Sequence, residues 1–93
     1  MTMVLLKPVY LKRFTKDVAR DKKRQRDFEK LKNLTNLLLA KQKLPEKHRN
    51  HKLQGEFNDC WECHIEPDWL LMYRKTSTEI IFVRLGAHAD LFG

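Results

Sequence analysis

The second half of the chain contains side chains that could move protons to and from a phosphate ester. Arg84 and His88 lie near the end of the sequence, and His51, His64 and Asp68 precede them. Imidazoles titrate near neutral pH, a carboxylate can accept a proton, and a guanidinium keeps its positive charge beside a phosphate. These residue types favour a small metal-free nuclease over a plain binding module.

Charge is distributed unevenly along the chain. Residues 1–54 contain 16 Lys and Arg and 5 Asp and Glu, a net charge of +11, whereas residues 55–93 contain 3 and 7, a net charge of −4. Clustered cations gain affinity for polyanions by releasing counterions, and they also steer charged partners. The basic first half therefore predicts a nucleic acid or an acidic protein as partner, although a solvated helical surface would have the same composition.

Length and hydropathy limit the domain organisation. The 93 residues, 42% of them hydrophobic, can form one modest core, so we expect a single domain over residues 1–93. The apolar runs fall short of the roughly 20 residues needed to cross a bilayer, and Lys7 and Pro8 interrupt the first of them. We therefore expect a cytoplasmic protein without membrane contact.

The apolar pattern of the first half predicts a strand followed by two helices. Residues 3–6 are expected to form a short strand, and Pro8 should end it or begin a helix. Helical spacing then predicts amphipathic helices over residues 10–18 and 28–38, joined by a charged link and lying side by side. Residues 43–50 are polar and contain a proline, so they are expected to form a surface loop that leads to the first candidate histidine.

In the second half of the chain, the spacing of apolar residues changes to the two-residue repeat of a β-strand. Residues 61–66 alternate between apolar and polar side chains, which predicts a half-exposed strand. Residues 69–74 and 80–85 are expected to form two further strands. Because residues 69–73 and 80–83 are nearly apolar on both faces, these strands should be central, with helices over one side. Gly86 should let the chain leave the last strand and bring His88 back across the end of the sheet. The predicted fold class is α+β: an N-terminal strand, two amphipathic helices and a three-strand antiparallel meander completing a small sheet.

The two cysteines suggest alternatives that the spacing does not favour. Cys60 and Cys63 lie in a C-x-x-C-H segment of the kind used for covalent haem, and His48 and His51 could complete a zinc site with them. In a strand, however, cysteines three positions apart point to opposite faces with Cα atoms about 10 Å apart, too far for a disulfide. We therefore expect two reduced thiols, one buried and one near the surface, with no metal and no other cofactor.

Three segments resemble the YafQ branch of the RelE/ParE toxins. The resemblance covers nearly the whole chain, loosely through the basic helices and tightly from His51 onward. It implies a RelE-like fold in one toxin domain over residues 1–93. The matching segments are His51-Lys52-Leu53-Gln54-Gly55, His64-Ile65-Glu66-Pro67-Asp68-Trp69 and Arg84-Leu85-Gly86-Ala87-His88-Ala89-Asp90-Leu91-Phe92-Gly93.

The resemblance implies a type II toxin that enters the ribosomal A site, cleaves mRNA and inhibits translation, and that a cognate antitoxin holds inactive. Members of this family cleave without a metal, by attack of a ribose 2′-hydroxyl on the adjacent phosphate. We expect His88 to be the general acid and Arg84 to stabilise the charge of the phosphorane. The general base should be His51, with Asp68 as the rival assignment.

Further roles follow from the same resemblance. His64 would position or neutralise the phosphate, and Trp69 and Phe92 would shape the pocket or stack on a base. Taken on its own, Trp69 could equally be a core residue. The related ParE toxins inhibit DNA gyrase on the same scaffold, and a basic RNA-binding module without turnover is a third hypothesis, but the paired acid and base candidates favour the nuclease.

Overall fold

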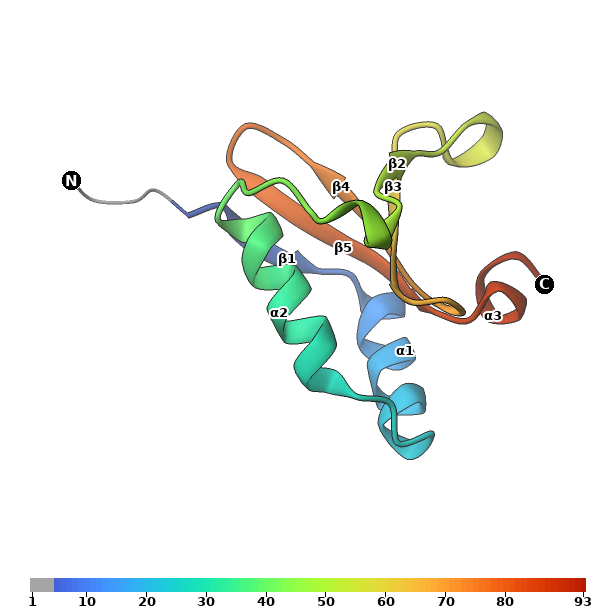
Figure 1. The fold of residues 1–93 in the computed structure, drawn as a ribbon. Helices are drawn as coiled ribbons and strands as arrows, with labels where there is room; N and C mark the ends of the chain where they lie inside the picture. The colour runs from blue at the N-terminus through green and yellow to red at the C-terminus, as the bar shows by residue number, and fades with distance from the viewer. Residues whose placement is uncertain (1–4) are drawn as a thin grey trace.

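A computed structural model describes residues 5–93 as a five-stranded sheet with two long helices and one short one (Figure 1). None of the helices in this part of the chain has the length and apolar character required to span a bilayer. The elements in chain order are β1 (Lys7–Tyr10), α1 (Lys12–Lys23), α2 (Phe28–Leu39), the 3₁₀ turn η1 (Glu46–His48), β2 (His51–Lys52), the 3₁₀ turn η2 (Gly55–Phe57), β3 (Trp61–Glu66), β4 (Trp69–Lys75), β5 (Glu79–Gly86) and α3 (His88–Phe92).

The strand order across the sheet is β1-β5-β4-β3-β2. Strands β3, β4 and β5 form the expected antiparallel meander, and β1 pairs with β5 in parallel. This arrangement confirms the α+β class with an N-terminal strand and two helices. The two-residue strand β2 at the far edge and the C-terminal helix α3 are additions that the apolar pattern did not predict, because both are too short to have a period.

The N-terminal strand lies later in the chain than expected. Residues 3 and 4 of the predicted strand fall outside the described residues, and the observed strand β1 includes Pro8. The prediction that Pro8 ends a strand or begins a helix is therefore wrong. Since β1 is an edge strand with one neighbour, a residue without an N–H group can be accommodated in it.

Helices α1 and α2 cover one face of the sheet (Figure 1). Phe14 of α1 and Leu31, Leu34 and Leu38 of α2 are buried in the core, at the helical spacing that the sequence predicts. Asp27 caps α2 by accepting a hydrogen bond from the main-chain nitrogen of Glu29, 3.1 Å away. An apolar stripe thus holds α2 on the sheet, whereas the buried side of α1 combines Phe14 with Asp17 and Asp21.

The central strand β4 is buried on both faces. Trp69, Leu71 and Tyr73 belong to the core beneath the helices, and Leu70 and Met72 between them are equally buried on the opposite face. This alternation confirms that residues 69–74 form a central strand. It also leaves the second face of the sheet to the strands and turns that carry the polar candidate residues.

Both cysteines are free and both are buried, which corrects the expectation that one lies near the surface. Cys60 precedes β3, so the alternation of faces along that strand does not apply to it. Burial raises the pKa of the Cys63 thiol far above its usual range, and burial also raises the pKa of Cys60. Both side chains are therefore neutral thiols that fill space rather than reactive groups.

Candidate active site

Cross-strand pairing brings the candidate residues to one face of the sheet. His51 of β2 pairs with Glu62 of β3, Glu62 pairs with Met72 of β4, and Met72 pairs with Arg84 of β5. Residues that face each other across antiparallel strands share a side of the sheet, so the register aligns these four positions in one row. His64 lies two positions after Glu62 on the same strand and therefore begins the next row on the same face.

His88 enters this face from the start of α3 and is held there by Asp68. Oδ1 of Asp68, in the turn between β3 and β4, accepts hydrogen bonds from the main-chain nitrogen of His88 at 3.0 Å and from its Nδ1 at 2.7 Å. These hydrogen bonds hold the pKa of the Asp68 carboxyl below its usual value. Asp68 is therefore an anion that orients the His88 ring.

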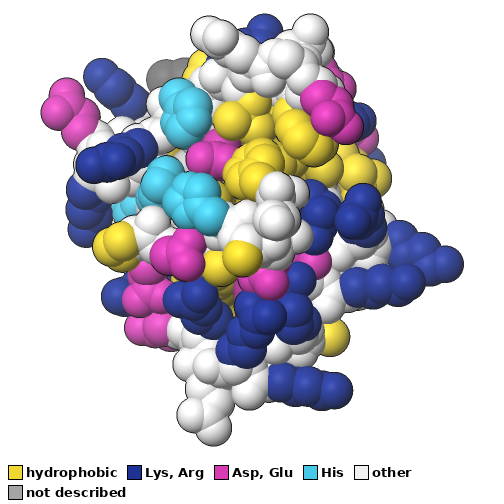
Figure 2. All heavy atoms as spheres, turned by 90° about the vertical axis from the view of Figure 1, so that its right-hand side faces the viewer, with side chains coloured by type: hydrophobic (Ala, Val, Ile, Leu, Met, Phe, Trp, Pro, Cys, Tyr) yellow, Lys and Arg dark blue, Asp and Glu magenta, His cyan; other side chains and the backbone are white. Residues whose placement is uncertain are grey.

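The imidazole rings gather around the carboxylate of Glu62. Oε1 of Glu62 lies 3.7 Å from Nε2 of His64 and 3.8 Å from Nε2 of His51. The ring of His88 lies 5.8 Å from that of His64, centroid to centroid. Figure 2 shows the histidines collected on one face of the molecule beside an apolar area, with Lys and Arg side chains around the rim. The structure therefore brings together three of the four histidines of the chain.

The hydrogen bonds of these rings determine which nitrogen faces the site. Nδ1 of His51 lies 2.6 Å from the carbonyl oxygen of Arg49, and Nδ1 of His64 lies 3.3 Å from that of Pro67. Because a carbonyl oxygen only accepts, each Nδ1 carries the proton, and the Nε2 of a neutral ring presents a lone pair. Both rings thus offer a proton acceptor toward Glu62.

Arg84 is less free than the sequence suggests. Its Nε donates to Oδ2 of Asp17 at 2.7 Å, and its Nη2 lies 3.3 Å from Oδ1 of the same carboxylate and 3.4 Å from the carbonyl oxygen of Asp90. Asp17 is a buried residue of α1 that also accepts from the main-chain nitrogen of Leu85. The desolvation cost of this arginine is therefore offset by a carboxylate within the protein.

The two aromatic candidates differ in accessibility. Trp69 is 0% exposed, and its Nε1 donates to Oδ2 of the buried Asp21 at 2.8 Å. A ring without exposed area cannot stack on a base, so Trp69 lies in the core, the alternative that the sequence left open, and its role in shaping the pocket from beneath stays a prediction. Phe92 is 48% exposed and lies near His88 and Phe57, with ring centroids 6.4 and 6.0 Å away. Phe92 is therefore placed where a base could stack beside the histidines.

Comparison with known proteins identifies the family. The model of a family described as the bacterial YafQ toxin of type II toxin-antitoxin systems matches residues 6–93. The chain belongs to the YafQ toxin family. This membership confirms the resemblance to RelE-like toxins that the sequence motifs indicate.

Similar proteins from two organisms illustrate the relationship. The mRNA interferase toxin YafQ of Escherichia coli K12 is 41% identical over 85 residues, which cover 90% of this chain and 92% of that protein. A chain in the crystal structure of the E. coli DinJ-YafQ toxin-antitoxin complex matches with a TM-score of 0.89 and 38% identity, covering 97% of this chain and all of that one. A metal-bound toxin from Helicobacter pylori matches with a TM-score of 0.88 and 34% identity, over 95% of this chain and all of that one.

One residue of this YafQ-family site escapes sequence reasoning. Glu62 was expected on the exposed face of a half-exposed strand, yet only 5% of it is exposed and its Oε2 has no hydrogen-bond partner among the described residues. Its position two residues before His64 was the available signal, since both must share a face. The strand β2, whose His51 pairs with Glu62, is not predicted by the sequence.

Proposed function

We propose that this chain is an mRNA interferase that cleaves RNA by attack of a ribose 2′-hydroxyl on the adjacent phosphate. The observation that carries the proposal is the gathering of His51, His64 and His88 on one face, with His88 anchored by Asp68. Such a group contains both a candidate proton acceptor and a candidate proton donor on the same face of the sheet. The names of its E. coli relatives as mRNA interferases support the same substrate class.

His51 is the proposed general base. Its Nδ1 donates to the carbonyl of Arg49, so Nε2 is free to take the proton of the 2′-hydroxyl. Asp68, the rival candidate, has a lowered pKa and commits its Oδ1 to His88. A carboxylate of low pKa accepts a proton poorly at neutral pH. The available Nε2 of His51 and the lowered pKa of Asp68 together favour His51 as the base.

His88 is the proposed general acid. As the 2′-oxygen bonds to phosphorus and the bond from phosphorus to the 5′-oxygen breaks, a protonated His88 gives its Nε2 proton to the leaving oxygen. The products are a 2′,3′-cyclic phosphate and a free 5′-hydroxyl, and the proton taken by His51 balances the one released. The anionic carboxylate of Asp68 stabilises the protonated ring through Nδ1. Proton transfer alone completes this reaction, so the proposed mechanism is metal-free.

Arg84, His64 and Phe92 are proposed to assist. The backbone of Arg84 lies in the same cross-strand row as that of His51, and its pairing with Asp17 fixes the guanidinium in place. A positive charge held in advance stabilises a phosphorane without reorganisation. His64 would position the phosphate from the neighbouring row, and Phe92 would support a base of the substrate.

The basic helix α1 is proposed to hold the enzyme on the ribosome. Lys12, Arg13 and Lys16 are exposed on this helix, whereas Arg20 and Arg24 already pair with carboxylates of the protein. Exposed cations suit ribosomal RNA around the A site, since phosphate contacts position a small enzyme without reading sequence. The proposal includes a cognate antitoxin, as in the E. coli complex, and action in the cytoplasm, where translating ribosomes are found.

The decisive experiment compares mRNA ends in translating cells that produce the wild-type chain or His88→Ala. Loss of a general acid typically lowers the rate by about 10²–10⁴, so the variant should leave mRNA nearly intact. His48→Ala is the matched control, because His48 is a histidine outside the proposed machinery. Equal cleavage by His88→Ala and wild type would refute the mechanism, and absence of cleavage by wild type would refute the function.

A further inference from the structure

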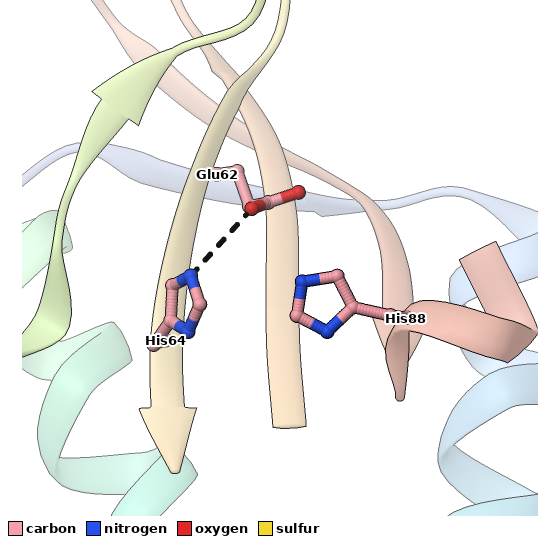
Figure 3. Close-up of side chains that lie close together, drawn as sticks. All are labelled: Glu62, His64 and His88. Atoms are coloured by element: carbon pink, nitrogen blue, oxygen red, sulfur yellow. Dashed lines mark ion pairs between the residues drawn. The ribbon is translucent and has the colours of Figure 1, made fainter. Parts of the chain in front are cut away.

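We propose that Glu62, His64 and His88 form a binding site for one divalent transition-metal ion, for which Zn²⁺ is the test ion, and that the bound ion switches the nuclease off. The three residues come from β3 and the start of α3 and face one another on the histidine-bearing face (Figure 3). The proposal that an ion binds here is argued from the positions of these three side chains. The inhibition rests on the proposed nuclease function.

The donor atoms are close enough to share an ion. One ligand atom from each of the three residues lies within 4.8 Å of the others, and Oε1 of Glu62 lies 3.7 Å from Nε2 of His64. Tetrahedral zinc with bonds of about 2.0–2.1 Å places its ligands about 3.3 Å apart. The side chains of His88 and Asp68 are 55% and 63% exposed, so the hydrogen-bonded pair has room to shift together and bring Nε2 of His88 closer.

The hydrogen bonds behind both rings match those of metal-bound histidines. Nδ1 of His88 donates to Asp68 at 2.7 Å, and Nδ1 of His64 lies 3.3 Å from the carbonyl oxygen of Pro67. A histidine ligand usually donates its second ring nitrogen to a carboxylate or a carbonyl, which fixes the ring and leaves the other nitrogen for the metal. Both rings therefore have Nε2 available as the ligand atom.

Glu62 supplies an independent sign that a cation belongs at this position. The residue is 5% exposed, and among the described residues its Oε2 has no hydrogen-bond partner. A buried carboxylate without compensation is costly, and neutral imidazoles offer it only lone pairs. A cation between the three side chains satisfies the carboxylate and both rings at once.

The donor set selects the kind of ion. Two imidazoles and one carboxylate suit Zn²⁺ and similar divalent transition metals, whereas Mg²⁺ and Ca²⁺ prefer shells made of oxygen. Three protein ligands leave the fourth position to water or to His51, whose Nε2 lies 3.8 Å from Oε1 of Glu62. The site therefore discriminates between these two groups of ions.

Ion binding and the proposed proton transfer compete for the same nitrogen. Coordination at Nε2 of His88 releases any proton on that atom to solvent and prevents the ring from protonating the leaving 5′-oxygen. Coordination of His64 also withdraws that ring from the phosphate. A bound ion thus removes the general acid while leaving the fold unchanged.

Calorimetric titration of the full chain with zinc chloride tests the site directly. One Zn²⁺ per chain should bind to the wild type and to Glu56→Gln, a control on the exposed turn η2. The variants Glu62→Gln, His64→Gln and His88→Gln should each bind at least about tenfold more weakly, and Asp68→Asn should lose about 10–100-fold because it supports a ligand. Unchanged affinity in the three ligand variants, or no binding to wild type, would overturn the site.

A second measurement avoids substitutions that could impair folding. Diethyl pyrocarbonate modifies accessible imidazoles, and mass spectrometry locates the modified residues. Zinc should protect His64 and His88 of the wild type, whereas Mg²⁺ at the same concentration should protect neither. His48 serves as the internal reference, since it lies outside the ligand set. Equal modification of His64 and His88 with and without zinc would contradict the proposal.

Inhibition is tested by mRNA cleavage on isolated ribosomes with and without zinc. Zinc should abolish cleavage by wild type, and a chelator should restore it. Glu62→Gln, measured against its own zinc-free rate, should resist inhibition. Stimulation of cleavage by zinc would overturn the inhibitory role. If wild type cleaves nothing under any condition, the proposed function fails while the calorimetric result still decides the metal site.

Discussion

The carboxylate of Asp68 accepts two hydrogen bonds from His88, one from its main-chain nitrogen and one from its imidazole. A single oxygen thereby fixes both the start of α3 and the orientation of the ring. The residue that the sequence offered as a rival base thus has a specific structural task, which is to present His88 to the site.

Replacing Asp68 with Asn should lower the rate of mRNA cleavage at least about tenfold, because a neutral amide stabilises a protonated imidazole less well than a carboxylate does. The rate is measured on ribosome-bound mRNA across a range of pH. Asp59→Asn, an exposed aspartate paired with Arg74, is the control and should cleave like wild type. A rate for Asp68→Asn equal to that of the control at every pH would contradict this orienting role.

Trp69→Phe should destabilise the fold without a matching loss of chemistry. The substitution removes the hydrogen bond from Nε1 to the buried Asp21, and a hydrogen bond to a charged group contributes about 1.5–3 kcal/mol. Urea denaturation should show a decrease of about that size in the free energy of unfolding. Trp61→Phe, at a half-buried position where Lys75 lies over the ring, should cost less. A large loss of cleavage at unchanged stability would instead assign Trp69 to substrate binding.

Gly86→Ala should displace α3 and with it His88, the proposed general acid. A Cβ at this position would lie 2.6 Å from Nη2 of Arg20 and 2.8 Å from Cβ of Asp90, so the chain after β5 must move. We expect a loss of about 1–3 kcal/mol in the free energy of unfolding, together with reduced cleavage. Gly55→Ala, with φ +72° but no atom within 4 Å of the added carbon, measures the backbone cost alone. Comparable effects of the two substitutions on cleavage would rule out steric displacement.

Acid should weaken the contacts of Asp90 with Arg20 of α1 and with Arg24, which follows this helix. The hydrogen bond from Arg24 outweighs the opposing effect of burial and lowers the pKa of Asp90 from 3.8 to about 2. A carboxyl whose pKa is lower in the folded state stabilises the fold above its unfolded pKa and loses this contribution as pH falls from about 4 to about 2. The difference in unfolding free energy between wild type and Asp90→Asn should therefore be constant above pH 5 and shrink below pH 4. A difference independent of pH down to 2 would exclude this contribution.

The apolar spacing predicts the helices and the meander because those elements bury stripes of their own residues. Phe14, Leu31 and Leu34 lie in the core as their spacing requires. Apolar spacing does not predict the position of β1. This strand can contain Pro8 only because it lies at the edge of the sheet. That property belongs to the assembled sheet rather than to the local sequence.

The sequence predicts which polar residues belong to the site but not which residues they pair with. The motifs identify His51, His64 and His88, and the structure gathers these residues on one face. The partner of Arg84 is the buried Asp17 of α1, which in the sequence looks like one more charge on a basic helix. Pairs between residues so far apart in the chain arise from packing, so no local pattern reports them.

The parallel pairing of β1 with β5 has a consequence for biosynthesis. Strand β1 cannot form its hydrogen bonds until β5 has been synthesised, because Lys7 pairs with Glu79 and Tyr10 with Phe82. Contacts between distant parts of a chain form late and slowly. His88 follows β5, so the proposed acid and base come together only after almost all of residues 5–93 have been translated.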